Sequence, residues 1–268
     1  MRNALATWKW SLLVTLRSPL AVLVLAIVAA LWGLGAYRWL WFPSEASVPQ
    51  LLVGGVWLLA LFVVLSGFVT VSITSVQAVA AEGRPTLTVR RLSHSNLHQI
   101  ASCMGSLAVA GLVVLVLSLA FGWVNHRALE VASFLTFRSE RAVAPETVEK
   151  VFRFLQALLW VVASGFLLGF VSATLQQGWK AAARAIPQLL ANACWRATFL
   201  TTCLGLIAFG GVSYLLATWH PKASAGFSDY AQAIIRLGVV LLWSVIGWLF
   251  WVLSVVRSSA TARDLPPA

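Results

Sequence analysis

Charged side chains are scarce in this chain of 268 residues. Asp, Glu, Lys and Arg make up 10% of it, whereas a soluble domain carries about 25%. Hydrophobic residues make up 60%, and the mean hydropathy is +0.87. A soluble domain of this length would lack the polar side chains needed to cover its surface. The composition therefore excludes a water-soluble enzyme and a disordered chain, and it indicates a protein that lies in a membrane.

Cysteine is also rare, and the motifs that accompany most cofactors and nucleophiles are missing. The chain has three cysteines, an odd number that argues against a disulfide scaffold. They are Cys103, Cys194 and Cys203, which we expect to be reduced packing residues. The sequence contains no Cys-x-x-Cys, no phosphate-binding glycine loop and no Gly-x-Ser-x-Gly. We therefore predict no catalytic residue and no cofactor, and we do not expect an enzyme.

Ionisable residues are missing from the middle of the long apolar runs, which argues against proton-coupled transport. His94 and His98 have a spacing that can place two imidazoles on one helix face, but the zincin pattern needs a Glu between them and the chain has Ser-Asn-Leu. Glu140, Glu146 and Glu149 lie in the longest outer connection, where we expect a solvated helix with internal ion pairs. No metal site is predicted.

Long apolar runs dominate the remaining sequence. About 20 apolar residues in a helix span the hydrocarbon core of a bilayer, and six charge-free runs have at least 20 residues. In lipid each backbone amide of a helix finds its partner within its own segment. The sequence therefore predicts an all-α fold, a polytopic transmembrane helix bundle with six spans. The predicted spans are 19–41, 51–74, 100–124, 154–177, 197–219 and 237–256.

Residues 1–18 form a predicted amphipathic lead-in to the transmembrane domain (19–256). Four large apolar residues recur at spacings of three and four, which predicts a helix that lies in the inner membrane interface. They are Leu5, Trp8, Leu12 and Leu16. Ser18 is expected to cap the next helix, with Pro19 at its first position. The first apolar run is longer than the 7–15 residues of a signal peptide, so we expect it to stay uncleaved.

The basic residues favour one orientation in the membrane. With the N-terminus inside, the inner segments carry 11 basic and two acidic residues, and the outer segments carry eight and six. Because positive charge concentrates on the cytoplasmic side, we expect both termini, including a tail at 257–268, in the cytoplasm of a bacterium with the chain in its inner membrane. This bias and contact with anionic headgroups explain the pI of about 10.8. A nucleic-acid partner would need a basic soluble module, and none is predicted.

Polar and small residues within the spans leave alternatives open. Polar side chains at the cytoplasmic end of the second span could line a hydrated vestibule or bond the carbonyls of their own helix. They are Thr70, Ser72, Thr74, Ser75 and Gln77. Gly165 and Gly169 form a Gly-x-x-x-Gly pair, which is typical of close helix packing. The segments after the second and fourth spans are weakly similar, either by chance or as a parallel repeat.

Tryptophan is abundant, with 14 residues. Many lie near predicted span ends, where indole rings favour the headgroup level. Five lie deeper, and we expect them to pack between helices or against lipid, with a Trp-lined substrate pocket as the alternative. They are Trp57, Trp160, Trp243, Trp248 and Trp251.

Two segments carry a resemblance to a broad group of bacterial six-helix membrane proteins, which includes the membrane domain found beside some glycerophosphodiester phosphodiesterases. The segments are 16–19 (LRSP), where the first span begins, and 178–184 (GWKAAAR), between two spans. The resemblance implies a six-span fold with an amphipathic lead-in. Because the chain has no catalytic phosphodiesterase motif, it implies no such activity.

The chain also resembles permease subunits of ABC-type exporters, through its N-terminal helix and residues 81–87 (AEGRPTL) before the third span. This resemblance implies a separate ATPase as partner. Such permeases more often have their largest outer segment between the fifth and sixth spans, whereas here it lies between the third and fourth. We expect a non-catalytic accessory or transport-associated membrane protein, with the permease subunit as the alternative. The sequence leaves the partner and the oligomeric state open.

Overall fold

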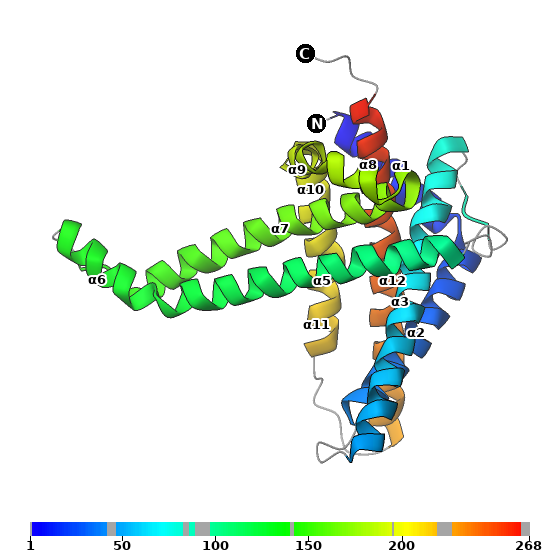
Figure 1. Ribbon diagram of the computed structural model, residues 1–268, viewed down its shortest axis with the longest axis horizontal. Helices are drawn as coiled ribbons and strands as arrows, with labels where there is room; N and C mark the ends of the chain where they lie inside the picture. The colour runs from blue at the N-terminus through cyan, green and yellow to red at the C-terminus, as the bar shows by residue number, and fades with distance from the viewer. Residues whose placement is uncertain are drawn as a thin grey trace.

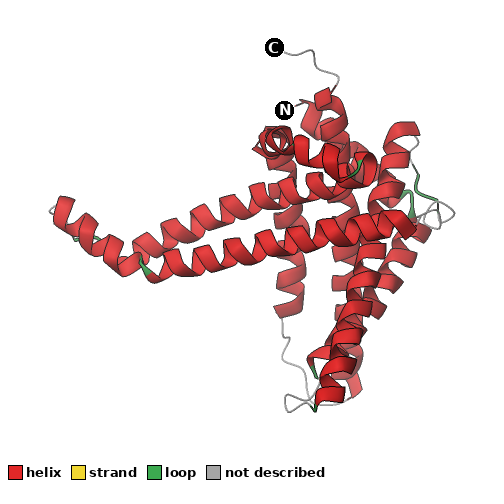
Figure 2. Cartoon of the chain, viewed as in Figure 1, coloured by secondary structure: helices red, strands yellow, loops and turns green. Residues whose placement is uncertain are grey.

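The protein, seen in a computed structural model, is built from helices (Figure 2). The structure describes residues 2–41, 47–82, 86–88, 97–139, 142–194, 196–218 and 227–263. Within these ranges every regular element is a helix and there is no strand. The predicted all-α fold is confirmed.

The helices follow one another closely along the chain. They are α1 (Arg2–Leu16), α2 (Pro19–Leu40), α3 (Val48–Glu82), α5 (Leu97–His126), α6 (Ala128–Ser139), α7 (Pro145–Gln177), α8 (Trp179–Arg184), α9 (Ile186–Cys194), α10 (Arg196–Gly205), η1 (Leu206–Gly211), α11 (Val212–Thr218) and α12 (Phe227–Arg263). In the described ranges six helical segments are long and apolar enough to cross a membrane. They are α2, α3, α5, α7, the continuous α10–η1–α11 and α12. The chain is therefore a multi-pass integral membrane protein.

Four helices extend beyond the spans predicted for them, namely α3, α5, α7 and α12. The helix that contains the predicted span 51–74 continues to Glu82. The last helix continues to Arg263, so most of the predicted tail at 257–268 is helical. These extensions make α3 and α12 longer than a bilayer core requires.

Both chain termini lie at one end of the molecule, together with α8 and α9 (Figure 1). The end of α2 and the starts of α3 and α12 lie toward the opposite end. The α5–α7 pair, with α6 at its tip, runs sideways across the direction of α2, α3 and α11. The helices therefore form a splayed bundle in which the α5–α7 pair is an arm.

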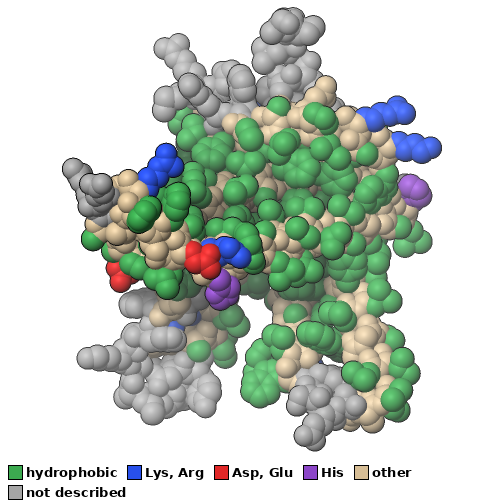
Figure 3. All heavy atoms as spheres, turned by 60° about the vertical axis from the view of Figure 1, so that its left-hand side comes forward, with side chains coloured by type: hydrophobic (Ala, Val, Ile, Leu, Met, Phe, Trp, Pro, Cys, Tyr) green, Lys and Arg blue, Asp and Glu red, His purple; other side chains and the backbone are tan. Residues whose placement is uncertain are grey.

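The buried core lies toward the end that holds the termini. Its largest fully buried apolar side chains come mainly from α3 and α12: Ile73, Val76, Val79, Leu249, Val252 and Leu253. Farther from that end, large apolar side chains such as Leu58, Leu115 and Leu119 are exposed. In Figure 3 hydrophobic side chains are spread over most of the visible face, and charged side chains are sparse there. A soluble monomer rarely exposes apolar surface of this extent, whereas the hydrocarbon of a bilayer covers it.

Ser18 lies at the bend between α1 and α2 but does not cap α2. Its hydroxyl donates to the Val14 carbonyl at 2.7 Å and accepts the Leu87 N–H at 2.8 Å. It makes no side-chain cap bond to α2, so the predicted cap is wrong, while Pro19 does occupy the first turn. The Ser18 hydroxyl instead binds the segment after α3 to this bend through the Leu87 N–H. Leu87 is buried there.

Helix α1 packs through small residues rather than through its predicted apolar stripe. Ser11, Val14 and Thr15 are buried, and the Ser254 hydroxyl of α12 donates to Ser11 Oγ at 3.0 Å. Three of the four stripe residues are exposed, Leu16 to 65%. The stripe is therefore free to face lipid, and the sequence analysis missed the small-residue face.

Indole N–H groups join α2 to α3 in the more exposed half of the molecule. They donate to backbone carbonyls of the opposite helix, from Trp32 to Leu61 (2.9 Å), from Trp39 to Gly54 (3.2 Å) and from Trp57 to Gly35 (3.1 Å). Two of the three acceptors are glycines, where no side chain shields the carbonyl. Trp57 thus packs between helices, as predicted.

Gly165 and Gly169 lie where α7 meets α9 and α10. A methyl group on Gly165 would lie 3.5 Å from Thr202 Oγ1, and one on Gly169 would lie 3.5 Å from Leu189 Cδ2. There is room for a methyl group and little more. The predicted close packing at this Gly-x-x-x-Gly pair is confirmed.

The α7–α8 junction is a sharp turn that Gly178 makes possible. Its φ of 79° lies in the left-handed region that favours glycine. The turn places the Trp179 ring 5.7 Å from that of Phe170 and directly over Gly105 of α5. Trp179 therefore packs against both α5 and α7 at the end where α7 joins α8.

Candidate intramembrane cavity

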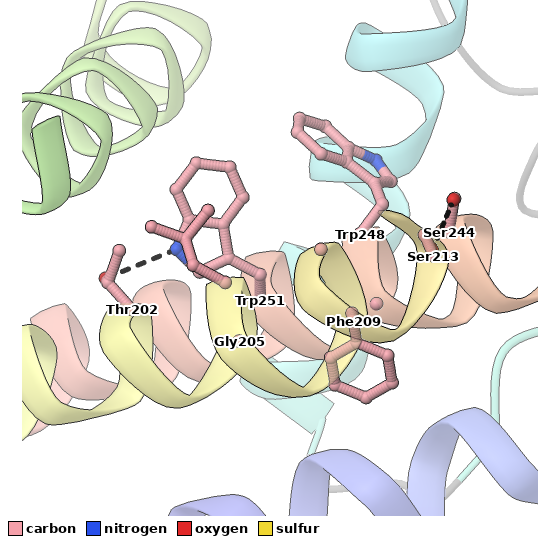
Figure 4. Close-up of a pocket in the computed structure, with 10 residues that line it drawn as sticks. Thr202, Gly205, Phe209, Ser213, Ser244, Trp248 and Trp251 are labelled. Carbon is pink, nitrogen blue, oxygen red and sulfur yellow. Dashed lines mark hydrogen bonds between the residues drawn. The ribbon is translucent and has the colours of Figure 1, made fainter. Parts of the chain in front are cut away.

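The contact between α12 and the η1 segment is unusually close. Gly247 of α12 faces Phe209, and a Cβ atom added to Gly247 would overlap the Phe209 side chain. Residues Leu206–Gly211 form a π-helical turn, and such turns are frequent at functional sites. Figure 4 shows α12 alongside the helix that carries Gly205 and Phe209.

Hydroxyl and indole groups join these two helices at the cavity. Ser213 Oγ and Ser244 Oγ lie 3.1 Å apart, and the Trp251 indole donates to Thr202 Oγ1 at 3.3 Å (Figure 4). Just outside the cavity, the Trp243 indole donates to the Ala208 carbonyl within the π-helical turn at 3.1 Å. Most polar groups in this region therefore already have a partner.

Trp248 of α12 is the side chain that three neighbouring cavities share. The first, about 220 Å³, lies between α12 and α10–η1–α11 and includes Thr202, Phe209 and Ser244. The second, about 240 Å³, lies among α2, α3 and α12, where the Phe68 ring is 6.2 Å from the Trp248 ring. The third, about 190 Å³, lies among α3, α5, α7 and α12. One indole thus lines all three cavities.

The Trp248 indole N–H has no hydrogen-bond partner among the described residues, although the nitrogen is buried. A buried donor without a partner costs about 1–3 kcal/mol. By contrast, the N–H groups of Trp243 and Trp251 are both bonded. The Trp248 indole N–H is therefore an unpaired donor with almost no accessible surface, although the residue lines all three cavities.

The described residues that line these cavities include no carboxylate, amine, guanidinium, imidazole or thiol. Their polar groups are a few hydroxyls and indole N–H groups. Such a lining can bind an uncharged and largely apolar molecule, and can orient it through hydrogen bonds. It supplies no side chain with a pKa near neutrality for general acid–base catalysis.

The polar residues at the end of α3 bond mainly within the protein. Thr70, Ser72 and Thr74 donate to carbonyls four residues earlier in α3. Gln77 donates to Ser172 Oγ of α7 at 2.9 Å. These contacts favour the interpretation in which the polar side chains bond groups within the protein over the one in which they line a hydrated vestibule. Ser75 Oγ is buried and has no partner among the described residues.

The other sequence candidates lie apart from the cavities. His98 is exposed at the start of α5, His94 falls outside the described residues, and no group of three or more metal-ligating side chains occurs in the part of the chain that the structure describes. Glu149 pairs with Arg153, and Glu130 with Arg127, as expected for internal ion pairs near α6, whereas Glu140 lies outside the described ranges. Glu146 is exposed in the first turn of α7.

The cysteines do not lie together. Among the described residues all three are free thiols. Cys103 is buried in the core as a small packing residue, whereas Cys194 is exposed at the end of α9. Cys203 is partly exposed on α10. The packing role predicted for them therefore holds for Cys103 and is wrong for Cys194.

No known protein family, curated protein or solved structure matches this chain. The cavity is therefore interpreted from its own residues. The sequence places Trp248 and Trp251 deep in the last span, with a Trp-lined pocket as one alternative. It gave no sign of the π-helical turn, since only the adjacent Gly210 and Gly211 hint at an irregular helix there.

Proposed function

We propose that this protein is a non-catalytic, transport-associated component of a bacterial inner membrane, with both termini in the cytoplasm, and that it binds an uncharged, largely apolar molecule within its helices. The supporting observation is the group of cavities around Trp248, whose lining combines aromatic rings with hydroxyls and contains no ionisable side chain. The termini at one end of the molecule agree with an even number of spans.

Photolabelling of the full chain in lipid nanodiscs tests the proposal. A diazirine-bearing alkane should label residues around Trp248 in α3 and α12, whereas exposed α6, outside the cavities, serves as the internal control. Incubation with a total lipid extract should leave the lipid composition unchanged by mass spectrometry. Labelling no stronger at the cavities than on exposed apolar helix faces, or conversion of a lipid, would overturn the proposal.

A second candidate function, a permease subunit with a separate ATPase, is favoured by α8 and α9. These short helices lie between two spans at the end that holds the termini. They expose basic Lys180 and Arg184 beside apolar Ile186 and Leu190. A surface with both characters suits a cytoplasmic protein partner.

Crosslinking from this surface separates the two candidates. A photoreactive amino acid at Leu190, introduced in the native cell, should capture an ATPase if the permease proposal is correct. The same amino acid at Ser139 in α6, on the arm far from the termini, is the matched control. A Leu190 adduct with lipid alone contradicts the permease function.

A further inference from the structure

We propose that α6 anchors the tip of the α5–α7 arm in the headgroup region of the membrane, with Phe134 and Phe137 inserted into the lipid. The proposal does not depend on what the cavities bind, because no residue of α6 is among the described residues that line them. It begins from two aromatic side chains on a helix that the sequence predicts to be solvated. Phe134 is 59% exposed and Phe137 is 87% exposed, so water would cover both rings if α6 were solvated.

Helix α6 has two faces of different character. One face carries the small residues Ala128 and Ala132, which are buried against Val148 of α7. The opposite face carries Leu129, which is also exposed, together with the two phenylalanines. Because successive residues of a helix are about 100° apart, these three side chains spread over about 140° of the helix surface. The face that α7 leaves uncovered is therefore the one with the large apolar side chains.

The junction between α5 and α6 holds the start of α6 at the membrane surface. Arg127 is the single residue between the two helices, and its Cζ atom lies 4.5 Å from the centre of the Trp123 ring. Trp123 is exposed, and an exposed indole beside a basic side chain is typical of the headgroup level. Since α5 is a candidate span, α6 begins where that span leaves the hydrocarbon.

The course of α6 keeps it close to the membrane. The chain turns at the junction, so α6 does not continue along the line of α5 (Figure 1). It packs on the first turns of α7, where Val148 lies six residues before Phe154, the start of the apolar part of α7. Six residues of helix correspond to about 9 Å, and the headgroup region on each side of a bilayer is about 5–8 Å thick. Large side chains on α6 are therefore within reach of the lipid.

The charges around α6 are compatible with a lipid surface. Glu130 and Glu149 pair with arginines three and four residues away, at 3.1 Å in each case. Arg138 and Lys150 are exposed, and Glu146 is the remaining exposed carboxylate in the described part of this segment. Five basic and four acidic residues lie between positions 127 and 153, which gives a small positive excess. Long basic side chains can reach headgroup phosphates while α6 lies in the interface.

The size of the exposed patch favours lipid over a second protein chain. An aromatic side chain buries about 150–250 Å², so two phenylalanines and one leucine stay below the roughly 800 Å² that each partner buries in a stable protein interface. Insertion into lipid has no such minimum, because its strength increases with each apolar area that is buried. In addition, α5 and α7 already hold α6 at the membrane, so insertion does not require a separate association step.

Electron paramagnetic resonance of a nitroxide label measures the depth of α6. The label is attached to Ser133→Cys in a full chain that carries Cys103→Ala, Cys194→Ala and Cys203→Ala, in nanodiscs of phosphatidylethanolamine and phosphatidylglycerol. Ser133 is exposed on the same face as Phe137, so both phenylalanines stay in place. Collisions with oxygen and with a water-soluble nickel chelate should place the label about 5–10 Å inside the membrane surface, the depth of an interfacial helix.

Two pairs of substitutions show whether the phenylalanines hold this depth. Phe134→Ser with Phe137→Ser should move the Ser133 label outward by about 5–10 Å. Phe134→Leu with Phe137→Leu is the matched control, which keeps apolar side chains and should leave the depth nearly unchanged. A label at Thr147, exposed in the first turn of α7, gives the reference for a site in water.

Two outcomes would overturn the proposal. If the Ser133 label is as accessible to nickel as the Thr147 label, α6 is solvated. If the Ser133 label is shielded from both oxygen and nickel, a protein surface covers this face instead of lipid. The proposed function of the cavities stands in either case, because it rests on other residues.

Discussion

Gly247 shows how one residue sets the distance between two helices. Its missing side chain lets α12 contact Phe209, with which a methyl group would overlap. We predict that Gly247→Ala lowers thermal stability in detergent by about 1–3 kcal/mol, the usual cost of overpacking. This loss exceeds the gain of up to about 1 kcal/mol that Ala brings to a helix.

Gly238→Ala is the matched control for this prediction. Gly238 lies on the same helix, and its Cβ would meet nothing within 4 Å. This variant should be as stable as the wild type or slightly more stable in the same melting experiment. If both variants melt alike, the close contact at Phe209 does not contribute to stability.

The residues of the cavity were predicted from the sequence only in part. The depth of Trp248 follows from the length of an apolar run, so a Trp-lined pocket could be kept as a hypothesis. Its unused N–H could not be predicted, because the N–H groups of Trp243 and Trp251 find acceptors on α10 and η1, far from them in the sequence. Which of several indoles remains without a partner is decided by tertiary packing.

At the scale of the helix, the sequence locates the spans well and their packing faces poorly. A span is recognised by its length and apolar content, which are local properties. In water an apolar stripe marks the buried face, but in lipid a large apolar side chain is equally stable outside the protein. Small residues then mark the packing face, as Ser11 and Thr15 do in α1 while Leu12 and Leu16 are exposed.

A substitution on each face of α1 tests this account. Ser11→Leu should separate α1 from α12, because Ser11 is fully buried and bonded to Ser254. Overpacking should destabilise this helix contact by about 1–3 kcal/mol. Hydrogen exchange of the α1 amides should therefore become at least about fivefold faster. Ala6→Leu adds the same side chain at an exposed position of α1 and should leave the exchange unchanged. Equal exchange in both variants would mean that α1 is not held by this face.

For the whole molecule, the two ends are distinguished by charge and by position. The inner segments predicted from the sequence hold most of the excess positive charge, and the termini, α8 and α9 lie together at one end (Figure 1). The charge distribution bears on the orientation of the chain in the cell membrane, whereas the position of these helices is a property of the fold alone. Together they predict that α9 lies in the cytoplasm and that α6 lies outside.

The native Cys194 makes this topology measurable. It is exposed at the end of α9, so in a Cys103→Ala, Cys203→Ala background it should react with a membrane-impermeant maleimide only after the cells are opened. With Cys194 also replaced by Ala, a cysteine introduced at exposed Ser139 of α6 should react in spheroplasts that are still intact. The reverse labelling pattern would mean that the protein has the opposite orientation in the membrane. Labelling of both sites from the same side would mean that α7, the candidate span between α6 and α9, does not cross the bilayer.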